Sequence, residues 1–332
     1  MVVVEAATDI QAADVVAIKT DNLMKKVAFI FPGQGSQTLG MGKDFFENSE
    51  IAKEMIASAS ARLGFDFEKL LFEENPQLEQ TEYTQPAILL VSAIATKLLQ
   101  DKCDIKPVFA LGHSLGEISA LVSVGALDYL DGVELVHNRG LFMKQACEGK
   151  NAGMMALLGL ADDVVEQICE EQRVAGKLIW AANYNVDGQL VLAGAKADLE
   201  SCVEVFKAAG AKRAIVLNMS VASHCPLLED AVEKLGNLAT KFLKEDFMAP
   251  IISNATCQKY STKEDAVALL KAQLTKPVLY KQSIANFEDE VDMFVELGNG
   301  NVLKGLNKKS SKPTVSVNNM TSLNEAIEAI NG

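Results

Sequence analysis

The residues with the clearest chemical potential lie in segment 108–116, V-F-A-L-G-H-S-L-G, where a serine stands between two glycines after an apolar run. A strand that turns sharply into a helix holds such a serine in a strained backbone, and glycine is needed where a Cβ would meet the neighbouring chain. We therefore expect Ser114 to project its hydroxyl between Gly112 and Gly116, below free N–H groups of a helix over 115–124. The motif predicts acyl transfer through a serine nucleophile. The alternative interpretation is a glycine-rich turn whose serine does no chemistry.

A serine hydroxyl needs a base, and histidine has a suitable pKa at neutral pH. The chain has three histidines. His113 adjoins Ser114 and should point away from its hydroxyl, so we expect a structural or orienting role, and for His137 we expect a solvated or packing role. His224 lies in M-S-V-A-S-H-C-P, in a loop between an expected strand and a proline-started helix, where it could face a cleft. His224 is therefore the candidate base.

Two further groups could complete an acyl-transfer site. No acidic residue can be assigned as the third member that commonly fixes the imidazole. Arg139 lies in a mostly apolar stretch, where a guanidinium would be costly to bury without an anion and is shaped to bind a carboxylate, although a surface position is the alternative. The loop G-Q-G-S-Q at 33–37 could bring the backbone N–H of Gln34 beside an oxyanion, or could simply be a tight strand-to-helix turn.

The elements that must position these groups follow from hydrophobic periodicity. Segment 27–31 is apolar on both faces, which is typical of a parallel strand buried between helices. Further short strands are expected at 251–252, 293–297 and 314–317, and helices at 44–63, 84–100, 128–147, 226–244, 261–274 and 322–330. In the second helix Thr84 or Gln85 should lie near the cap and Pro86 in the first turn, where its missing N–H costs nothing.

Shorter units occupy the middle of the chain. They are expected to be a strand at 154–158, a helix at 161–172, strands at 178–183 and 189–193, a helix at 196–209 and a strand at 213–217. This β-α-β-β-α-β order is typical of a ferredoxin-like lobe. We expect that lobe over 151–218, inserted into a larger α/β lobe formed by 24–150 and 219–332.

The composition limits the partners and the compartment. The formal net charge of −13 argues against nucleic acid or an anionic membrane as the main partner. The six cysteines contain no C-x-x-C pair, so neither a zinc site nor a disulfide framework is indicated, and a reducing cytoplasm is expected. Residues 1–23 match neither a signal peptide nor a transit peptide, and we interpret them as a leader or added extension before a native start at Met24.

Several motifs occur in an order and spacing that resemble the malonyl-CoA:acyl carrier protein transacylase family, from Met24 to about Lys309. They are F-P-G-Q-G-S-Q at 31–37, G-H-S-L-G-E at 112–117, N-R-G at 138–140, N-Y-N-x-x-G-Q at 183–189, S-V-x-S-H-C at 220–225 and Q-L-x-x-P-V at 273–278. The chain departs from the family at Leu279-Tyr280, where a basic or polar residue and then Trp are frequent, and at Gly298-Asn299-Gly300, where G-P-G is usual.

The resemblance implies an α/β-hydrolase-like large lobe with a parallel sheet, an inserted ferredoxin-like lobe, and an active site in the gorge between them. The implied site residues are Ser114 as the acylated nucleophile, His224 as the general base, Arg139 as the clamp for the malonyl carboxylate, Gln273 as the group whose carbonyl orients the imidazole, and Gln34 and Leu115 as donors of the two oxyanion-hole N–H groups.

The implied activity is malonyl transfer from malonyl-CoA to the phosphopantetheine thiol of acyl carrier protein, through a malonyl-serine, in support of fatty acid synthesis. No cofactor or metal is implied, acyl carrier protein is the expected partner, and we expect a cytoplasmic monomer. Three alternatives stay open: a serine thioesterase or hydrolase that uses Ser114 and His224, a transferase for another acyl group, since Val221-Ala222-Ser223 varies in related enzymes, and a non-catalytic module that binds carrier protein.

Overall fold

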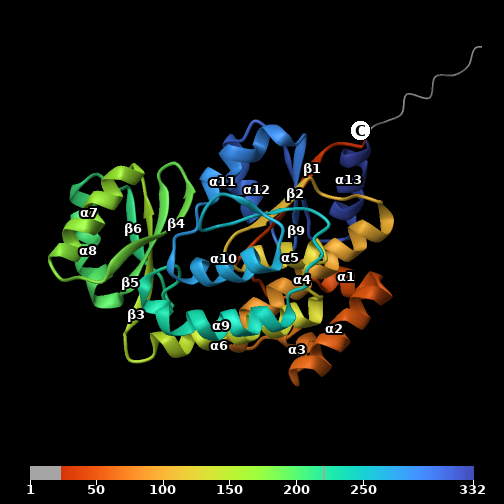
Figure 1. Cartoon of the computed structure of the whole chain (residues 1–332), viewed down its shortest axis with the longest axis horizontal. Helices are drawn as coiled ribbons and strands as arrows, with labels where there is room; N and C mark the ends of the chain where they lie inside the picture. The colour runs from red at the N-terminus through yellow and green to blue at the C-terminus, as the bar shows by residue number, and fades with distance from the viewer. Residues whose placement is uncertain (1–23, 220) are drawn as a thin grey trace, which may run out of the picture.

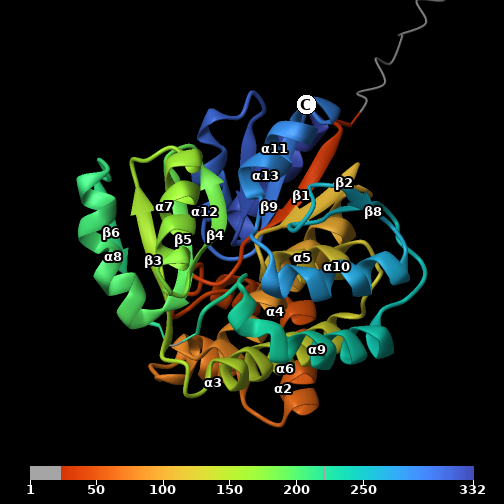
Figure 2. The same cartoon turned by 60° about the vertical axis from the view of Figure 1, so that its left-hand side comes forward.

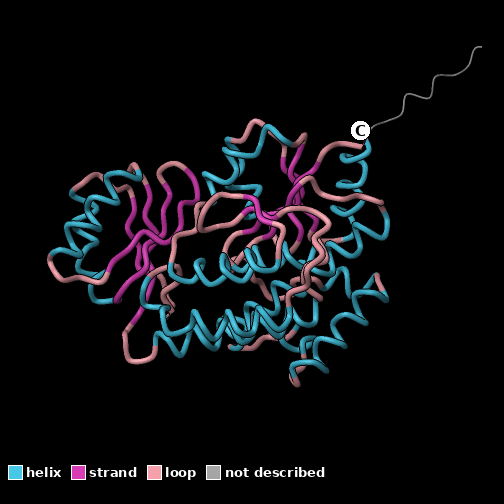
Figure 3. The backbone as a smooth tube through the Cα atoms, in the orientation of Figure 1, coloured by secondary structure: helices cyan, strands magenta, loops and turns pink. Residues whose placement is uncertain are grey.

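The computed structural model describes residues 24–219 and 221–332, so the expectation for residues 1–23 lies outside the described part. Two separate β-sheets organise the chain, and each lies in its own lobe (Figures 1 and 3). No helix within the described ranges is long and apolar enough to cross a membrane.

The large lobe contains a six-stranded sheet that is parallel except for its last pair, β7 and β8. In spatial order its strands are β10 (Thr314–Val317), β9 (Met293–Leu297), β1 (Val27–Phe31), β2 (Phe109–Gly112), β7 (Ile251–Ile252) and β8 (Lys259–Tyr260). Side chains of β1 alternate between two buried clusters, with Phe29 and Phe31 in one and Ala28 and Ile30 in the other. Both faces of this strand are therefore covered, as its sequence predicted.

Helices cover the large sheet and extend below it. They are α1 (Lys43–Asn48), α2 (Glu50–Leu63), α3 (Phe67–Phe72), α4 (Thr81–Lys102), α5 (Leu115–Ser123), α6 (Tyr129–Cys147), α9 (Glu229–Phe242), α10 (Lys263–Thr275), α11 (Tyr280–Phe287), α12 (Val302–Leu306) and α13 (Met320–Asn331). Helix α6 packs against α4 and lies beside α9 (Figures 1 and 2). Helix α6, which carries Arg139, also contacts α5, the helix that follows β2.

The small lobe contains an antiparallel sheet with strand order β4-β5-β3-β6, and it forms the left side of Figure 1. Its elements are β3 (Ala152–Leu158), α7 (Asp162–Val174), β4 (Ile179–Val186), β5 (Gln189–Ala195), α8 (Lys196–Ala208) and β6 (Arg213–Val216). This connectivity is that of a ferredoxin-like lobe. The predicted fold class, a large α/β lobe with a parallel sheet and an inserted ferredoxin-like lobe, is confirmed.

Two expected helices differ from the structure. The single helix expected over 44–63 is wrong, because Ser49 is extended between α1 and α2 and its hydroxyl accepts a hydrogen bond from the N–H of Ala52. A serine that caps its own helix interrupts a hydrophobic pattern that otherwise runs through. The start expected at Thr84 or Gln85 is also wrong, because α4 begins at Thr81.

Pro86 consequently lies inside α4, where proline leaves a carbonyl of the preceding turn without its donor. That carbonyl belongs to Glu82, and Nδ1 of His137 lies 2.7 Å from its oxygen. The His137 ring also packs beside the rings of Phe65 and Tyr83, at 5.7 and 6.1 Å. His137 therefore has the packing role expected for it and supplies the hydrogen bond that proline cannot donate.

We expect His137→Ala to lower the free energy of unfolding by about 1–3 kcal/mol, because the nearly buried Glu82 carbonyl would lose its donor. In a Pro86→Ala background the cost should be smaller, since the restored N–H can donate to the same carbonyl. Urea unfolding of the two single variants and the double variant measures this coupling, while the lost ring packing is common to both backgrounds. Equal costs of His137→Ala in the two backgrounds would contradict the assignment.

Candidate active site

The predicted turn at Ser114 is built by close backbone contacts. Ser114 has φ 54° and ψ −107° between β2 and α5. A Cβ on Gly112 would lie 1.9 Å from the main-chain carbon of Gly116, and a Cβ on Gly116 would lie 2.1 Å from the carbonyl oxygen of Phe31. Only glycine fits at both positions, so the two glycines allow the chain to present the serine at the end of the sheet.

A buried asparagine holds this strained turn on both sides. Oδ1 of Asn254 accepts a 2.7 Å hydrogen bond from the N–H of Ser114, and Nδ2 donates a 2.7 Å bond to the carbonyl of Gly112. Asn254 follows β7 and is 1% exposed. The sequence analysis missed this residue, since a single asparagine far along the chain carries no local signal of the contact.

His224 lies where a general base would be required. Its Nε2 is 2.7 Å from Oγ of Ser114, and its Nδ1 is 2.7 Å from the main-chain oxygen of Gln273. A carbonyl oxygen can only accept a hydrogen bond, so Nδ1 carries the proton and Nε2 presents its lone pair to the serine hydroxyl. The backbone of His224 is itself strained, with φ 60°.

The surroundings keep the imidazole uncharged. Burial and, as a smaller effect, the nearby Arg139 cation lower the pKa of His224 to about 3, against the opposing hydrogen bond to Gln273. At neutral pH His224 is therefore in the form that can accept a proton.

Arg139 is 2% exposed, which excludes the surface position left open by the sequence. Its Nη1 donates to Oε1 of Gln85 at 2.7 Å, and its Nη2 donates to Oε1 of Gln273 at 3.0 Å and to Oγ of Ser114 at 3.1 Å. Its Nε is buried without a hydrogen-bond partner among the described residues. Burial lowers the pKa of Arg139 to about 10, so the group stays a cation that is surrounded mainly by neutral acceptors. Such a cation suits an anionic ligand.

The two residues predicted as oxyanion donors belong to segments next to the serine turn. Leu115 is the first residue of α5, where N–H groups have no carbonyl partner within the helix. The loop that contains Gln34 touches the turn, because a Cβ on Gly33 would lie 2.3 Å from the carbonyl oxygen of His113. Oε1 of Gln34 accepts a 2.9 Å hydrogen bond from Oγ1 of Thr81. The main chain of this loop therefore lies beside the nucleophile.

His113 joins the two lobes next to the nucleophile. Its Nε2 lies 2.7 Å from Oδ1 of Asn185 in β4, and burial lowers its pKa. The ring of Tyr280, one of the departures from the family pattern, lies 5.7 Å from the His113 ring and its hydroxyl donates to Oδ1 of Asn307 at 3.0 Å. At the other departure, Nδ2 of Asn299 donates to the carbonyl of Ser36 at 2.6 Å.

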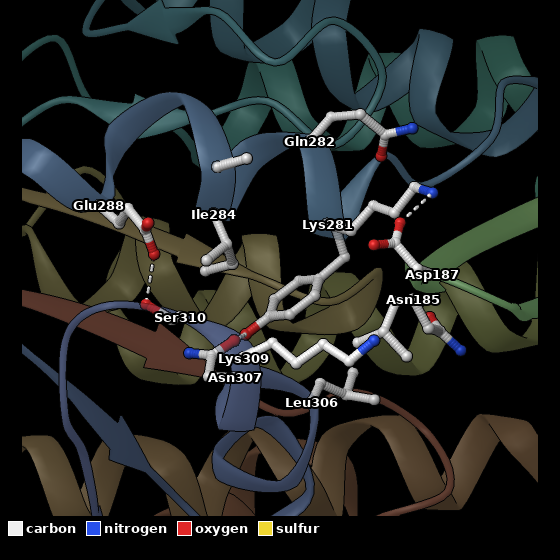
Figure 4. A pocket seen from close by; sticks show the side chains of 13 residues that line it. Asn185, Asp187, Lys281, Gln282, Ile284, Glu288, Leu306, Asn307, Lys309 and Ser310 are labelled. Carbon is white, nitrogen blue, oxygen red and sulfur yellow. Dashed lines mark hydrogen bonds and ion pairs between the residues drawn. The ribbon is translucent and has the colours of Figure 1, made fainter.

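A pocket of about 290 Å³ opens beside Asn185 (Figure 4). Its lining comes from β4 and the turn after it, from α11 and the residue that follows it, and from the end of α12 and the segment beyond: Asn185, Val186, Asp187, Tyr280, Lys281, Gln282, Ile284, Ala285, Glu288, Leu306, Asn307, Lys309 and Ser310. Figure 4 shows Lys281 and Asp187 turned toward one another, 3.0 Å apart. The pocket thus lies where the two lobes meet. It is close to the nucleophile, because Asn185 in its lining contacts His113, the residue before Ser114.

A buried carboxylate behind the serine was also missed. Glu117 is 0% exposed and accepts hydrogen bonds from the N–H of Asn254, the hydroxyl of Tyr260 and Nε2 of Gln273. Burial raises the pKa of Glu117 to about 7, against the lowering effect of these bonds. Its hydrogen bonds go to Asn254, Tyr260 and Gln273 and not to His224, so it is not a third triad member. The available signal was an acidic residue in an otherwise apolar helix directly after the serine.

The described residues contain no group of three or more histidine, cysteine or acidic side chains arranged to hold a metal ion. All six cysteines are buried and unpaired.

The pKa of His224 gives a stability prediction. The unfolded chain takes up this proton near pH 6.5 and the folded chain only near pH 3, so the stabilising contribution is present above pH 6.5 and is lost as pH falls toward 3. Between about pH 7 and about pH 5, wild type should lose roughly 2 kcal/mol of unfolding free energy relative to His224→Gln, which cannot titrate. Urea unfolding of both proteins at both pH values measures the difference. The titration of His113 contributes equally to wild type and variant and therefore cancels. A difference that does not change with pH would contradict the burial of a neutral imidazole.

Comparison with known proteins agrees with this geometry. Residues 28–324 match the family model for the acyl transferase domain. The malonyl CoA-acyl carrier protein transacylase of Bacillus subtilis is 37% identical over 311 residues, which cover 92% of this chain and 98% of the relative.

Solved structures give the same result. The malonyl-CoA:acyl carrier protein transacylase of Helicobacter pylori superposes with a TM-score of 0.90 at 49% identity, over 92% of this chain and 98% of that one. A malonyl-transacylase solved in complex with its type II PKS acyl-carrier protein has a TM-score of 0.88 at 34% identity, over 92% and 99%. The resemblance found in the motifs is confirmed. The chain is therefore an acyltransferase that belongs to the acyl transferase domain family and, within it, to the malonyl CoA-acyl carrier protein transacylases.

Proposed function

We propose that this acyltransferase moves the malonyl group of malonyl-CoA to the phosphopantetheine thiol of acyl carrier protein through a malonyl ester of Ser114. One observation carries the proposal: Oγ of Ser114 lies 2.7 Å from Nε2 of the uncharged His224 and 3.1 Å from Nη2 of the buried Arg139. A nucleophile, its base and a cation for the acyl carboxylate thus meet at one atom. The names of the relatives support the same substrates.

In the first half-reaction Oγ of Ser114 attacks the thioester carbonyl while Nε2 of His224 takes the hydroxyl proton. The carbonyl oxygen becomes an oxyanion, which in this proposal the main-chain N–H groups of Gln34 and Leu115 stabilise. When the intermediate collapses, the C–S bond breaks and His224 returns the proton to the departing sulfur of CoA. The malonyl group remains as an ester on the serine.

The second half-reaction runs the same steps with a different thiol. His224 takes the proton of the phosphopantetheine thiol, the sulfur attacks the ester carbonyl, and the same N–H groups stabilise the oxyanion. The C–O bond to Ser114 then breaks, and His224 returns the proton to Oγ. The neutral base is restored and malonyl-carrier protein leaves.

Arg139 has two effects on the choice of acyl group. Its guanidinium can bind the free carboxylate of malonyl through two hydrogen bonds. In addition, repulsion from Arg139 lowers the pKa of His224 in the free enzyme, so a bound carboxylate that offsets this charge would raise the pKa of His224. A malonyl substrate therefore strengthens the base that activates Ser114, whereas an acetyl group cannot.

The remaining assignments complete the proposal. We assign residues 151–218 and residues 24–150 with 219–332 to two domains, because the small sheet packs on its own buried cluster. The reaction as written uses the two substrates and no cofactor or metal. Six unpaired cysteines favour a reducing cytoplasm. Fatty acid synthesis is the expected use of the product, and a monomer stays a prediction.

Arg139→Ala tests the choice of donor. The variant should lose malonyl transfer by on the order of 10² or more in kcat/KM, while acetyl-CoA should be used as well as or better than by wild type, because acetyl leaves the buried cation unpaired. Arg139→Lys should restore malonyl transfer only in part, since an ammonium cannot form two parallel hydrogen bonds with the carboxylate.

The measurement is the ratio of kcat/KM for malonyl-CoA and acetyl-CoA at fixed salt, with holo acyl carrier protein as acceptor. A ratio that Arg139→Ala leaves unchanged would mean that this arginine does not select the donor.

A further inference from the structure

Glu117 is a fully buried carboxylate with no place in the mechanism above. Its three hydrogen-bond donors come from three separate elements: the loop after β7, strand β8 and helix α10. The distances are 3.0 Å from the N–H of Asn254, 3.0 Å from the hydroxyl of Tyr260 and 2.7 Å from Nε2 of Gln273. The last of these donors belongs to a residue that the site uses twice more.

Gln273 links the base and the cation. Its main-chain oxygen faces Nδ1 of His224, and its side-chain Oε1 accepts a 3.0 Å hydrogen bond from Nη2 of Arg139. The orientation of the side-chain amide decides whether Arg139 meets an acceptor or a donor. Oε2 of Glu117 accepts from Nε2 at 2.7 Å and also from the N–H of Asn254, and the main-chain carbonyl of Ser114 accepts from the same Nε2 at 3.0 Å. Glu117, the shorter of the two contacts to Nε2, therefore holds this nitrogen toward itself and Oε1 toward the guanidinium. The reversed amide would place an N–H group against Arg139 and an oxygen against the carboxylate.

Resting on the function proposed above, we propose that Glu117 is a positioning residue for malonyl recognition. It fixes the side-chain amide of Gln273, and that amide holds Arg139 beside the nucleophile. Glu117 touches neither substrate nor the reacting atoms, so it acts only through the position of the guanidinium. Removing Glu117 should therefore slow transfer from a donor that carries a free carboxylate and leave transfer from other donors largely unaffected.

Two substitutions separate hydrogen bonding from charge. In Glu117→Gln the new amide oxygen can accept from Asn254 and Gln273, while its NH₂ can donate to the Tyr260 hydroxyl, which is able to accept. Glu117→Leu has a similar size and provides no acceptor. Tyr260→Phe is the matched control, because it removes a buried hydrogen bond from the same carboxylate without touching Gln273.

The readout is the kcat/KM ratio of malonyl-CoA to acetyl-CoA, with holo acyl carrier protein as acceptor. Glu117→Leu should lower the ratio about 10-fold or more, Glu117→Gln should keep it within about three-fold of wild type, and Tyr260→Phe should leave it unchanged. If Glu117→Leu does not fold, Glu117→Asp, which keeps the charge but draws it back from Gln273, should also lower the ratio.

Equal losses for both donors in Glu117→Leu, or in Glu117→Asp where Leu does not fold, would show a merely structural role and overturn the proposal. The proposal would also be overturned if Tyr260→Phe lowered the malonyl-to-acetyl ratio of kcat/KM as much as the change at Glu117 does. A Glu117→Gln ratio as low as that of Glu117→Leu would overturn the hydrogen-bond account in favour of charge. Wild type must first form a malonyl ester on Ser114, and its failure to do so would refute the proposed function separately from this inference.

Discussion

The strained backbone at Ser114 is the constraint on which the rest of the site depends. A non-glycine residue at φ 54° costs on the order of 1–3 kcal/mol, and the structure holds it there by other contacts. Asn254 binds the chain on both sides of the serine, and Gly112 and Gly116 let neighbouring backbones approach within distances that no Cβ allows. Because β1 and β2 are adjacent parallel strands, the loop after β1 and the turn after β2 meet at one edge of the sheet. The strain and the strand order together bring Ser114 and the segments that carry the proposed oxyanion donors to one edge of the sheet.

The site built on this turn is organised by buried charge. Arg139 is a cation with mostly neutral partners, and the buried Glu117 is separated from it by the amide of Gln273. His224 stays neutral because burial penalises its charged form and because a charged imidazole would be a second cation near Arg139. An anionic acyl group would give the buried Arg139 cation an anionic partner, whereas a neutral acyl group would not. In the proposed function, the same buried cation would account for recognition of the donor and for the strength of the base, without a carboxylate on the imidazole.

Much of this could be predicted from local sequence. Local spacing of residues correctly predicted three features: the strand at 27–31, the shorter units of the small lobe and the turn at G-H-S-L-G. The expected start of α4 failed because its outcome depends on a partner far along the chain: His137 makes Pro86 tolerable inside a helix. Asn254 and Glu117 were missed for a related reason, since their meaning lies in contacts between distant segments. His224 and Arg139 lie within hydrogen-bond distance of Ser114, a proximity that the motifs indicated and that spacing alone left open.

The central claim is that Ser114 carries the malonyl group between two thiols. Its most direct test is the mass of the intact protein after brief exposure to malonyl-CoA, with the modified residue located by peptide mass spectrometry. We expect the mass of one malonyl group on Ser114, no adduct on Ser114→Ala, and rapid loss of the adduct to holo acyl carrier protein but slow loss to water. An adduct on another residue, an adduct retained by Ser114→Ala, or loss to water as fast as to the carrier protein would contradict the account.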